Sequence, residues 1–312
     1  MALTVKPILP RFGAEVSGVD ITKPLDEATQ REIVAVQDQY GITVWRNTGL
    51  TDATHVAFSR IFGHLELAPR PPGRPARYEH QELFDAGNLD AEGNIITNEM
   101  IRLHKKGDRL WHTDSSFMPM RSAYSLLLCH EAPPVDGETW FADTRSAYED
   151  LAQATKDRIE TLEADHSIWW SRKMAGYPFT DEEVEARPSA RHPLVHVHAG
   201  SGRKTMYVAA HAKDIVGMPK DEGRALLKEL IAFATQPQYT FKVRYQPGDM
   251  VIWDNLCSMH RGGDFDEMNH RRDMRRTTVR EGVPPEQADD PFGEMFKAAG
   301  QSAFSQSARA GA

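Results

Sequence analysis

The sequence has little cysteine: two residues, Cys129 and Cys257, among 312. Two cysteines are too few for a disulfide framework, so we predict two buried free thiols in a reducing compartment. Cys257 lies three residues before His260, which raises the alternative of half a zinc site. No second pair of Cys or His residues at zinc-ligand spacing accompanies it, and the sequence therefore does not favour structural zinc.

The chain also lacks an excess of positive charge. Its 37 lysines and arginines are outnumbered by 45 aspartates and glutamates, which gives a formal net charge of −8. Proteins that bind nucleic acid hold the phosphate backbone with clusters of Lys and Arg, so this balance argues against nucleic acid as a partner. An acidic surface does not exclude a small anionic substrate, because a pocket can be locally positive.

Long apolar runs and glycine-rich nucleotide motifs are missing as well. No stretch approaches the roughly 18 apolar residues that a membrane-spanning helix needs. The first 16 residues contain Lys6, Pro7 and Pro10 and no apolar core, unlike a signal peptide. We therefore predict a cytoplasmic protein without a membrane partner. Neither G-x-G-x-x-G nor a P-loop occurs, which disfavours the common nucleotide-binding folds.

What is present is a series of short β-rich runs with a few helical stretches between them. Strict alternation of strand and helix is absent, which disfavours a Rossmann sheet and favours a mainly β protein with helices, a sandwich or jelly roll. The predicted helices start at Asp26 as N-cap and run through Gln37, then cover 53–62, 148–163 and 220–235. The predicted β-rich runs are 42–46, 94–101, 111–117, 122–132, 187–210, 239–245, 250–255 and 275–281.

We predict one domain over residues 1–282, followed by an extension. Residues 283–312 are rich in Pro, Ala, Gly and Ser, and form either a loose tail or an arm that contacts another copy in a homo-oligomer. A long Pro-, Gly- and charge-rich loop covers 68–93. Loops of that length inside a compact domain are usually functional or disordered, so this one is either a lid or a disordered segment.

The strongest local signal is the pair His112 and Asp114 in the segment Trp-His-Thr-Asp. On an extended strand, residues i and i+2 point to the same face, so an imidazole and a carboxylate can aim at one point. A His–carboxylate pair joined by a distant His is the facial triad of non-haem Fe(II) oxygenases. By itself an H-x-D pair is weak evidence, because 13 histidines make chance pairs easy.

His260 is the candidate for the third metal ligand. It follows the apolar run Met250–Asn255 and precedes Arg261, Gly262 and Gly263. A histidine at the end of a buried strand beside flexible glycines is well placed to bind a metal. Taken alone, it is more often a hydrogen-bonded core or surface histidine.

An arginine-rich stretch over 271–276 follows. If it forms a strand, Arg272, Met274 and Arg276 share a face, with the two arginines about 13 Å apart. Inward guanidinium groups are costly to bury unless they meet anions, and two carboxylates, a co-substrate and a substrate, would satisfy them. A solvated basic strand is the alternative interpretation of the same pattern.

These residues, in this order, resemble the taurine/2,4-dichlorophenoxyacetate dioxygenase family. The resemblance extends from Val16 to Val279 and includes the segments VSGVDITKPL, FSRIFGHLE, LWHTDSSF, PPVDGETWFADTRSAYEDL, HAGSGRKTMYVAAH, GDMVIWDNLCSMHRG and RRDMRRTTV. It implies a double-stranded β-helix (jelly roll) core, and an enzyme that uses Fe(II), 2-oxoglutarate and O₂.

The resemblance also implies roles for individual residues. His112, Asp114 and His260 resemble the iron ligands. Arg272 resembles the arginine that binds the far carboxylate of 2-oxoglutarate, with Thr139 as its hydroxyl partner. Arg276 resembles the arginine that receives the acid group of the substrate. The segment between His260 and the arginines is one residue longer than the family pattern, so Arg271 and Arg275 are the alternative register.

The segments 198–204 and 208–219 are more similar to the phenoxyacetate-cleaving branch than to the taurine branch. This implies hydroxylation beside the ether oxygen of a small anionic aryloxyalkanoate such as 2,4-dichlorophenoxyacetate, and collapse to a phenol and an oxo acid. His211 either lines the substrate pocket or is a structural histidine. Asp108 stands where a neutral polar residue is expected, and would repel an anion if it faced the pocket.

Other interpretations remain open at this stage. A dioxygenase for a sulfonate or alkyl sulfate would use the same iron site and Arg276. A cupin-like binding protein would have the fold without turnover, and a zinc hydrolase would need a general base that the sequence does not show. The aromatic residues of the segment 169–179, which are Trp169, Trp170, Tyr177 and Phe179, form either a lid or else packed core or surface contacts.

Overall fold

A computed structural model of the chain describes residues 2–68 and 77–282. The predicted extension 283–312, and the part of the predicted lid over 69–76, lie outside the described residues. None of the helices in the described part is long and apolar enough to cross a membrane.

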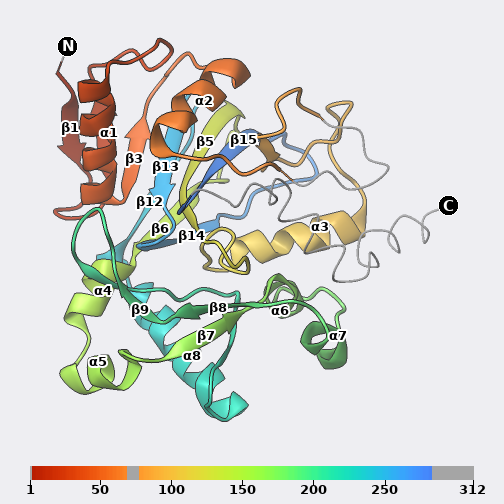
Figure 1. Cartoon of the computed structure of the whole chain (residues 1–312). Helices are drawn as coiled ribbons and strands as arrows, with labels where there is room; N and C mark the ends of the chain where they lie inside the picture. The colour runs from red at the N-terminus through yellow and green to blue at the C-terminus, as the bar shows by residue number, and fades with distance from the viewer. Residues whose placement is uncertain (1, 69–76, 283–312) are drawn as a thin grey trace.

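The main sheet has seven strands in the order β1-β2-β3-β13-β5-β15-β4. Its strands are antiparallel to their neighbours except for the parallel pair β2 and β3. Figure 1 shows helices α1 and α2 on one side of this sheet. The strands are β1 (Thr4–Pro7), β2 (Ala14–Ser17), β3 (Ile42–Trp45), β13 (Met250–Asp254), β5 (Ser122–Glu131), β15 (Asp273–Arg280) and β4 (Phe84–Asp85), and the helices are α1 (Glu27–Tyr40) and α2 (Asp52–Ser59), the latter continued by a 3₁₀ turn, η1 (Arg60–Phe62).

A smaller sheet of three strands, in the order β12-β6-β14, faces the main one. Its strands are β12 (Thr240–Val243), β6 (Thr139–Asp143) and β14 (Ser258–Gly262), with the 3₁₀ turn η3 (Pro237–Tyr239) leading into β12. The pairing of β6 with both neighbours is antiparallel. The mainly β class and the jelly-roll core predicted from the sequence are confirmed.

Alternation along the central strands builds the core between the two sheets. In β5, Leu127 and Cys129 belong to the cluster between the sheets, which also contains Phe141 of β6 and Val251 and Trp253 of β13. The residues between them on the same strands point the other way, into a cluster with Ile33 of α1 and Phe58 of α2. This period of two follows from the pleat of a strand that is buried on both faces.

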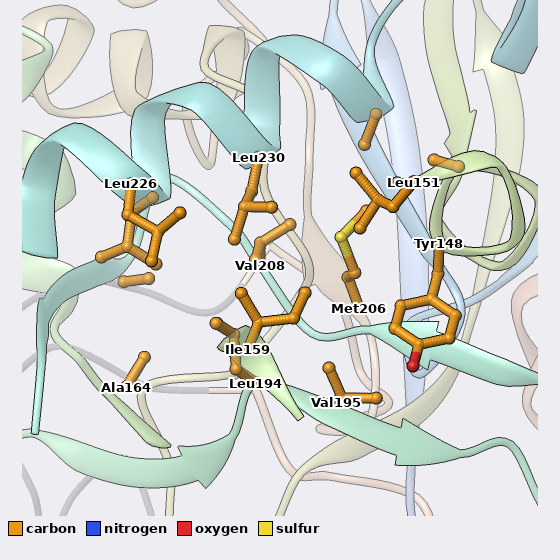
Figure 2. Close-up of a cluster of buried hydrophobic side chains, with 14 of the residues drawn as sticks. Tyr148, Leu151, Ile159, Ala164, Leu194, Val195, Met206, Val208, Leu226 and Leu230 are labelled. Atoms are coloured by element: carbon orange, nitrogen blue, oxygen red, sulfur yellow. The ribbon is translucent and has the colours of Figure 1, made fainter. Parts of the chain in front are cut away.

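A second lobe packs below the small sheet in Figure 1. Leu226 and Leu230 of helix α8 meet Leu194, Ile159 and Val208, as Figure 2 shows. The lobe contains two further sheets, β11-β7-β8 and β10-β9. Its elements are α4 (Thr144–Asp150), α5 (Gln153–Ile159), β7 (Glu163–His166), α6 (Ile168–Met174), α7 (Asp181–Glu185), β8 (Ala190–Pro193), β9 (Val195–Val197), β10 (Lys204–Met206), β11 (Ala212–Ile215) and α8 (Lys220–Ala234).

Three sequence-based assignments are wrong. Residues 94–101 form no strand; Asn98 instead accepts a hydrogen bond from the backbone of Ile101 and caps helix α3 (Glu99–Lys105). The predicted helix 148–163 is two helices, because Leu151 and Ala152 are extended between α4 and α5. The strand predicted over 111–117 shrinks to one bridge at His112, since the backbone turns at Ser115, which has φ 53°.

Candidate metal centre and its surroundings

His112, Asp114 and His260 come together at the end of the small sheet. His112 forms an isolated antiparallel bridge with His260 on β14, and each backbone N–H donates to the other residue's carbonyl, at 2.9 and 2.7 Å. The ring centroids of the two histidines are 4.2 Å apart. One ligand atom from each of the three residues lies within 4.8 Å of the others, and all three are buried. The side chains that we predicted a strand would orient are therefore positioned by this bridge.

The protonation states of these three side chains suit a metal cation. The Nδ1–H of His112 donates to the carbonyl of Leu110 at 2.8 Å, which leaves Nε2 as the free donor atom. Burial lowers the pKa of His260 to about 3, so its ring is neutral near pH 7. Burial alone would raise the pKa of Asp114, but the charge of Arg276 holds it well below its usual range. Two imidazoles and one carboxylate fit a 2-His-1-carboxylate Fe(II) site.

A hydrogen-bond network centred on Asn255 fixes the orientation of Asp114. The amide oxygen of Asn255 accepts from the backbone N–H of Asp114 at 3.0 Å and from Nε1 of Trp253 at 3.1 Å. Its amide nitrogen donates to Oγ of Ser125, which donates in turn to Oδ2 of Asp114 at 2.7 Å. The carboxylate is therefore held through its backbone and through one oxygen.

We expect Asn255→Ala to lower the affinity for divalent metal by about 10- to 100-fold, because loss of such supporting groups loosens a ligand without removing it. The measurement is the dissociation constant for Mn²⁺ or Fe²⁺ by anaerobic calorimetry. Asn269→Ala is the matched control, since the side chain of Asn269 donates only to Asp266 on the surface. Equal metal affinity of the two variants would contradict a positioning role for Asn255.

Tyr245 contacts Thr139, and Arg272 belongs to its electrostatic surroundings. The hydroxyl of Tyr245 donates to Oγ1 of Thr139 at 2.9 Å, and its phenol interacts electrostatically with Arg272. Arg272 lies just before β15 and donates from Nη1 to the carbonyl of Ala86. The surrounding protein desolvates the guanidinium and lowers its pKa. Among the described residues, no carboxylate lies within ion-pair distance of Arg272.

Arg276 points toward the metal centre. Its Nη1 donates to Oδ1 of Asp114, and its guanidinium lies over the ring of Phe84, 4.8 Å from the centroid. Its Nε is buried and has no hydrogen-bond partner among the residues that the structure describes. The alternative register is turned away: Arg271 pairs with Glu131 at 2.9 Å, and Arg275 pairs with Asp52 at 2.6 Å.

His211 lies beside His112, one of the three residues of the metal centre. Its ring centroid is 5.7 Å from that of His112 and 5.1 Å from that of Phe117. Its Nδ1 is hydrogen-bonded to Oγ of Ser116 at 3.1 Å. Burial lowers the pKa of His211 well below its ordinary value, so the ring is neutral. His211 is thus close enough to the triad to contact a molecule bound there.

The aromatic residues of the segment 169–179 and the two cysteines do not belong to the metal centre. Trp169 and Phe179 pack with Phe117 in a buried cluster, with Trp170 and Tyr177 at its edge, as expected for packed core. Cys129 and Cys257 are buried free thiols, as predicted.

Cys257 lies near His198 and Asp254 in a second His/Asp/Cys cluster, not beside His260. Both ring nitrogens of His198 are already hydrogen-bonded, Nε2 to Asp254 at 2.7 Å and Nδ1 to Ser201 at 2.7 Å. This cluster is therefore satisfied without a metal, in contrast to the triad.

Several residues of the site escaped the sequence analysis. Asn255 and Ser125 carry no signal of their own, because a buried Asn or Ser resembles any other polar residue until its partners are known. Tyr245 could have been found, since it alternates with Val243 on the same side of a β-rich run. Arg172 lies in α6 and belongs to no motif of the sequence.

Comparisons with known proteins agree with this geometry. The model of one family, described as taurine catabolism dioxygenase TauD, TfdA family, matches residues 4–278. The α-ketoglutarate-dependent 2,4-dichlorophenoxyacetate dioxygenase of Cupriavidus pinatubonensis is 36% identical over 282 residues, covering 89% of this chain and 98% of that protein. The (S)-phenoxypropionate/α-ketoglutarate-dioxygenase of Sphingobium herbicidovorans is 32% identical, with 89% and 95% covered.

Solved structures of dioxygenases are also similar to this chain. The crystal structure of AAD-2 in complex with Mn(II) and N-oxalylglycine superposes with a TM-score of 0.81 at 35% identity, covering 92% of this chain and all of that one. A taurine dioxygenase from Burkholderia xenovorans superposes with a TM-score of 0.72 at 28% identity, with 92% and 94% covered.

Proposed function

This chain belongs to the TauD/TfdA family of α-ketoglutarate-dependent dioxygenases, and we propose that His112, Asp114 and His260 hold its Fe(II). The enzyme is an oxidoreductase that uses Fe(II), 2-oxoglutarate and O₂. Three ligands on one face of the metal leave positions for the co-substrates. The compact N/O donor set of the triad supports this assignment.

The observation that carries the co-substrate site is the desolvated guanidinium of Arg272 without a carboxylate partner. A guanidinium in that state is costly unless an anion reaches it, and its fork matches a carboxylate with two parallel hydrogen bonds. Arg272 would bind the far carboxylate of 2-oxoglutarate, and the hydroxyl of Thr139 would add a further contact. Tyr245 would hold Thr139 in place.

Substrate binding would fall to Arg276, which contacts Asp114, and to His211, which lies beside His112. The buried, unpartnered Nε of Arg276 supports a role in accepting the acid group of a small substrate. We propose an aryloxyalkanoate such as 2,4-dichlorophenoxyacetate, because relatives that cover nearly the whole chain are named for such substrates. His211 and Phe117 would contact the aryl ring.

The chain's own groups position the reaction. Bound iron supplies the activation of O₂, coupled to decarboxylation of 2-oxoglutarate to succinate and CO₂. Arg276 would hold the substrate acid so that the carbon between the acid and the ether oxygen faces the metal. Holding the substrate in this geometry is the protein's contribution to the reaction. Hydroxylation of that carbon gives a hemiacetal, which breaks its aryl ether bond to leave a phenol and an oxo acid.

The test is an anaerobic titration of Fe(II) with 2-oxoglutarate, observed through the weak visible metal-to-ligand absorption band, on wild type and His112→Ala. We expect the band in wild type and its loss in the variant. Aryloxyacetates are then screened for O₂-dependent release of phenol with one succinate per turnover. Absence of the band in folded wild type at saturating iron would overturn the metal assignment.

A sulfonate or alkyl sulfate is the second candidate substrate. It is favoured by the alkylsulfatase of Acinetobacter baylyi, which is 27% identical over 286 residues. Arg276 suits a sulfonate as well as a carboxylate, so the same screen includes taurine and hexyl sulfate. Sulfite or sulfate release without phenol release would replace the aryloxyalkanoate proposal. A binding protein without turnover would release no succinate with any probe.

A further inference from the structure

An ion pair that no role above explains lies beside the metal centre. Nη2 of Arg172 on α6 donates to Oδ1 of Asp108 at 2.8 Å. Asp108 lies in a 3₁₀ turn, η2 (Lys106–Arg109), just before the segment that carries His112. Arg172 is 8% exposed. A Cβ on Gly107 would lie 1.8 Å from Nη1 of Arg172, so the guanidinium lies directly over that glycine.

The pair is part of the surroundings of the metal and of His211. The carbonyl of Asp108 lies near Gly262, two residues after His260. The backbone N–H of Ser167, the N-cap of α6, donates to the carbonyl of His211 at 2.8 Å. The ion pair therefore links the helix that starts beside His211 to the turn that packs against the strand of His260.

Both partners keep unused hydrogen-bonding capacity. Nε of Arg172 is buried without a partner, and Oδ2 of Asp108 accepts no hydrogen bond, within the part of the chain that the structure describes. The side chain of Asp108 is 50% accessible, although desolvation by the surrounding protein is the largest influence on its pKa. The Asp108 carboxylate is therefore half open to a molecule that binds beside the pair.

The charges of Asp108 and Arg172 limit which chemical groups can bind beside the ion pair. The positive charge of Arg172 is neutralised by Asp108, so the pair offers no net attraction for a second acid group. A cation would meet the repulsion of the nearby metal and of Arg172 itself. A neutral group that donates a hydrogen bond can satisfy the free carboxylate oxygen at no such cost.

Resting on the proposed function, we infer that the Asp108–Arg172 pair recognises the end of the substrate opposite its acid group, and that this end is uncharged and carries a hydrogen-bond donor such as a hydroxyl. Within the proposed aryloxyalkanoate class, the favoured substrate then carries a distal hydroxyl or amide N–H and binds more tightly than a member such as 2,4-dichlorophenoxyacetate, whose ring carries only halogens. Asp108 accounts for the preference for an uncharged end, since a neutral residue in its place would leave Arg172 free for an anion.

The experiment measures binding without turnover, by anaerobic calorimetry on the Fe(II)/2-oxoglutarate enzyme. The probes are 4-hydroxy-, 4-chloro- and 4-carboxyphenoxyacetate, which share the acid and the ether and differ at the far end. Wild type is expected to bind the hydroxy probe about tenfold more tightly than the chloro probe, and the carboxy probe most weakly. Asp108→Asn is expected to improve the carboxy probe at least tenfold relative to the chloro probe, because Arg172 loses its counter-charge.

Asp264→Asn is the matched control, since Asp264 is an exposed carboxylate that pairs with Arg109 at 2.7 Å. Gly107→Ala is a second variant, which displaces the Arg172 guanidinium while leaving both charges in the chain. It is expected to reduce the preference for the hydroxy probe.

Binding of all three probes with affinities within twofold of one another overturns the inference and leaves the proposed function intact. If Asp108→Asn binds the carboxy and chloro probes with the same ratio of affinities as wild type, the inference is also overturned and the proposed function is left intact. Failure of every probe to bind, with the iron and 2-oxoglutarate band present, overturns the proposed substrate class and the inference with it.

Discussion

Replacing Arg272 by alanine is expected to weaken 2-oxoglutarate binding by about 100-fold while leaving metal affinity unchanged. A bidentate pair between a guanidinium and a carboxylate contributes about 3 kcal/mol, which corresponds to about two factors of ten in affinity. The guanidinium has no carboxylate partner among the described residues, so the variant leaves no buried anion of the protein unpaired. Its one lost contact is to the carbonyl of Ala86. The measurement is the 2-oxoglutarate dissociation constant by anaerobic calorimetry with Mn²⁺ bound.

Arg271→Ala is the control, and it also tests the register of the two arginines. Arg271 is exposed and pairs with Glu131 on the surface, where such a pair is worth about 1 kcal/mol at most. We expect its 2-oxoglutarate affinity to stay within threefold of wild type. A large loss in Arg271→Ala together with a small one in Arg272→Ala would show that the register is shifted by one residue.

The extent of prediction from sequence differs between the fold and the site. The long, strongly periodic elements were predicted well: Asp26 caps α1 as expected, and the run 220–235 is α8 except for its last residue. Two of the three failures occur where polar side chains compete with the backbone. Asn98 turns an apparent strand into a helix start, and Ser115 takes a positive φ that no strand can continue.

The centre illustrates a second limit. His112 and Asp114 were selected because a strand would aim both side chains at one point, and they do meet, yet no strand holds them. A single bridge to His260 and the Asn255 network place them instead. The bridge and the hydrogen bond between Asn255 and Asp114 join residues that are more than 140 positions apart in the chain, and neither spacing nor composition reports them. The same applies to Asp108, whose charge was noticed in the sequence but whose partner, Arg172, was not.

Replacing Arg276 by glutamine is expected to lower kcat/KM for the aryloxyalkanoate by about 100-fold, with 2-oxoglutarate affinity unchanged. The loss again corresponds to about 3 kcal/mol for a charged, bidentate contact with the substrate acid. Glutamine keeps a polar group on a shorter side chain and removes the charge and the bidentate fork. The steady-state rates with and without substrate, followed as succinate and phenol release, measure the effect.

Metal affinity is a second measurement on Arg276→Gln, and unlike kcat/KM it is not expected to fall. Arg276 contacts Oδ1 of Asp114 and competes with a cation for that carboxylate, so Arg276→Gln is expected to bind Mn²⁺ as tightly as wild type or more tightly. Arg275→Gln is the control. Its guanidinium pairs with Asp52 and Asp273 away from the centre, and its loss is expected to cost about 1 kcal/mol of stability and to leave kcat/KM within threefold. Weaker metal binding in Arg276→Gln would mean that this arginine supports the iron site, and the substrate acid would then need another partner.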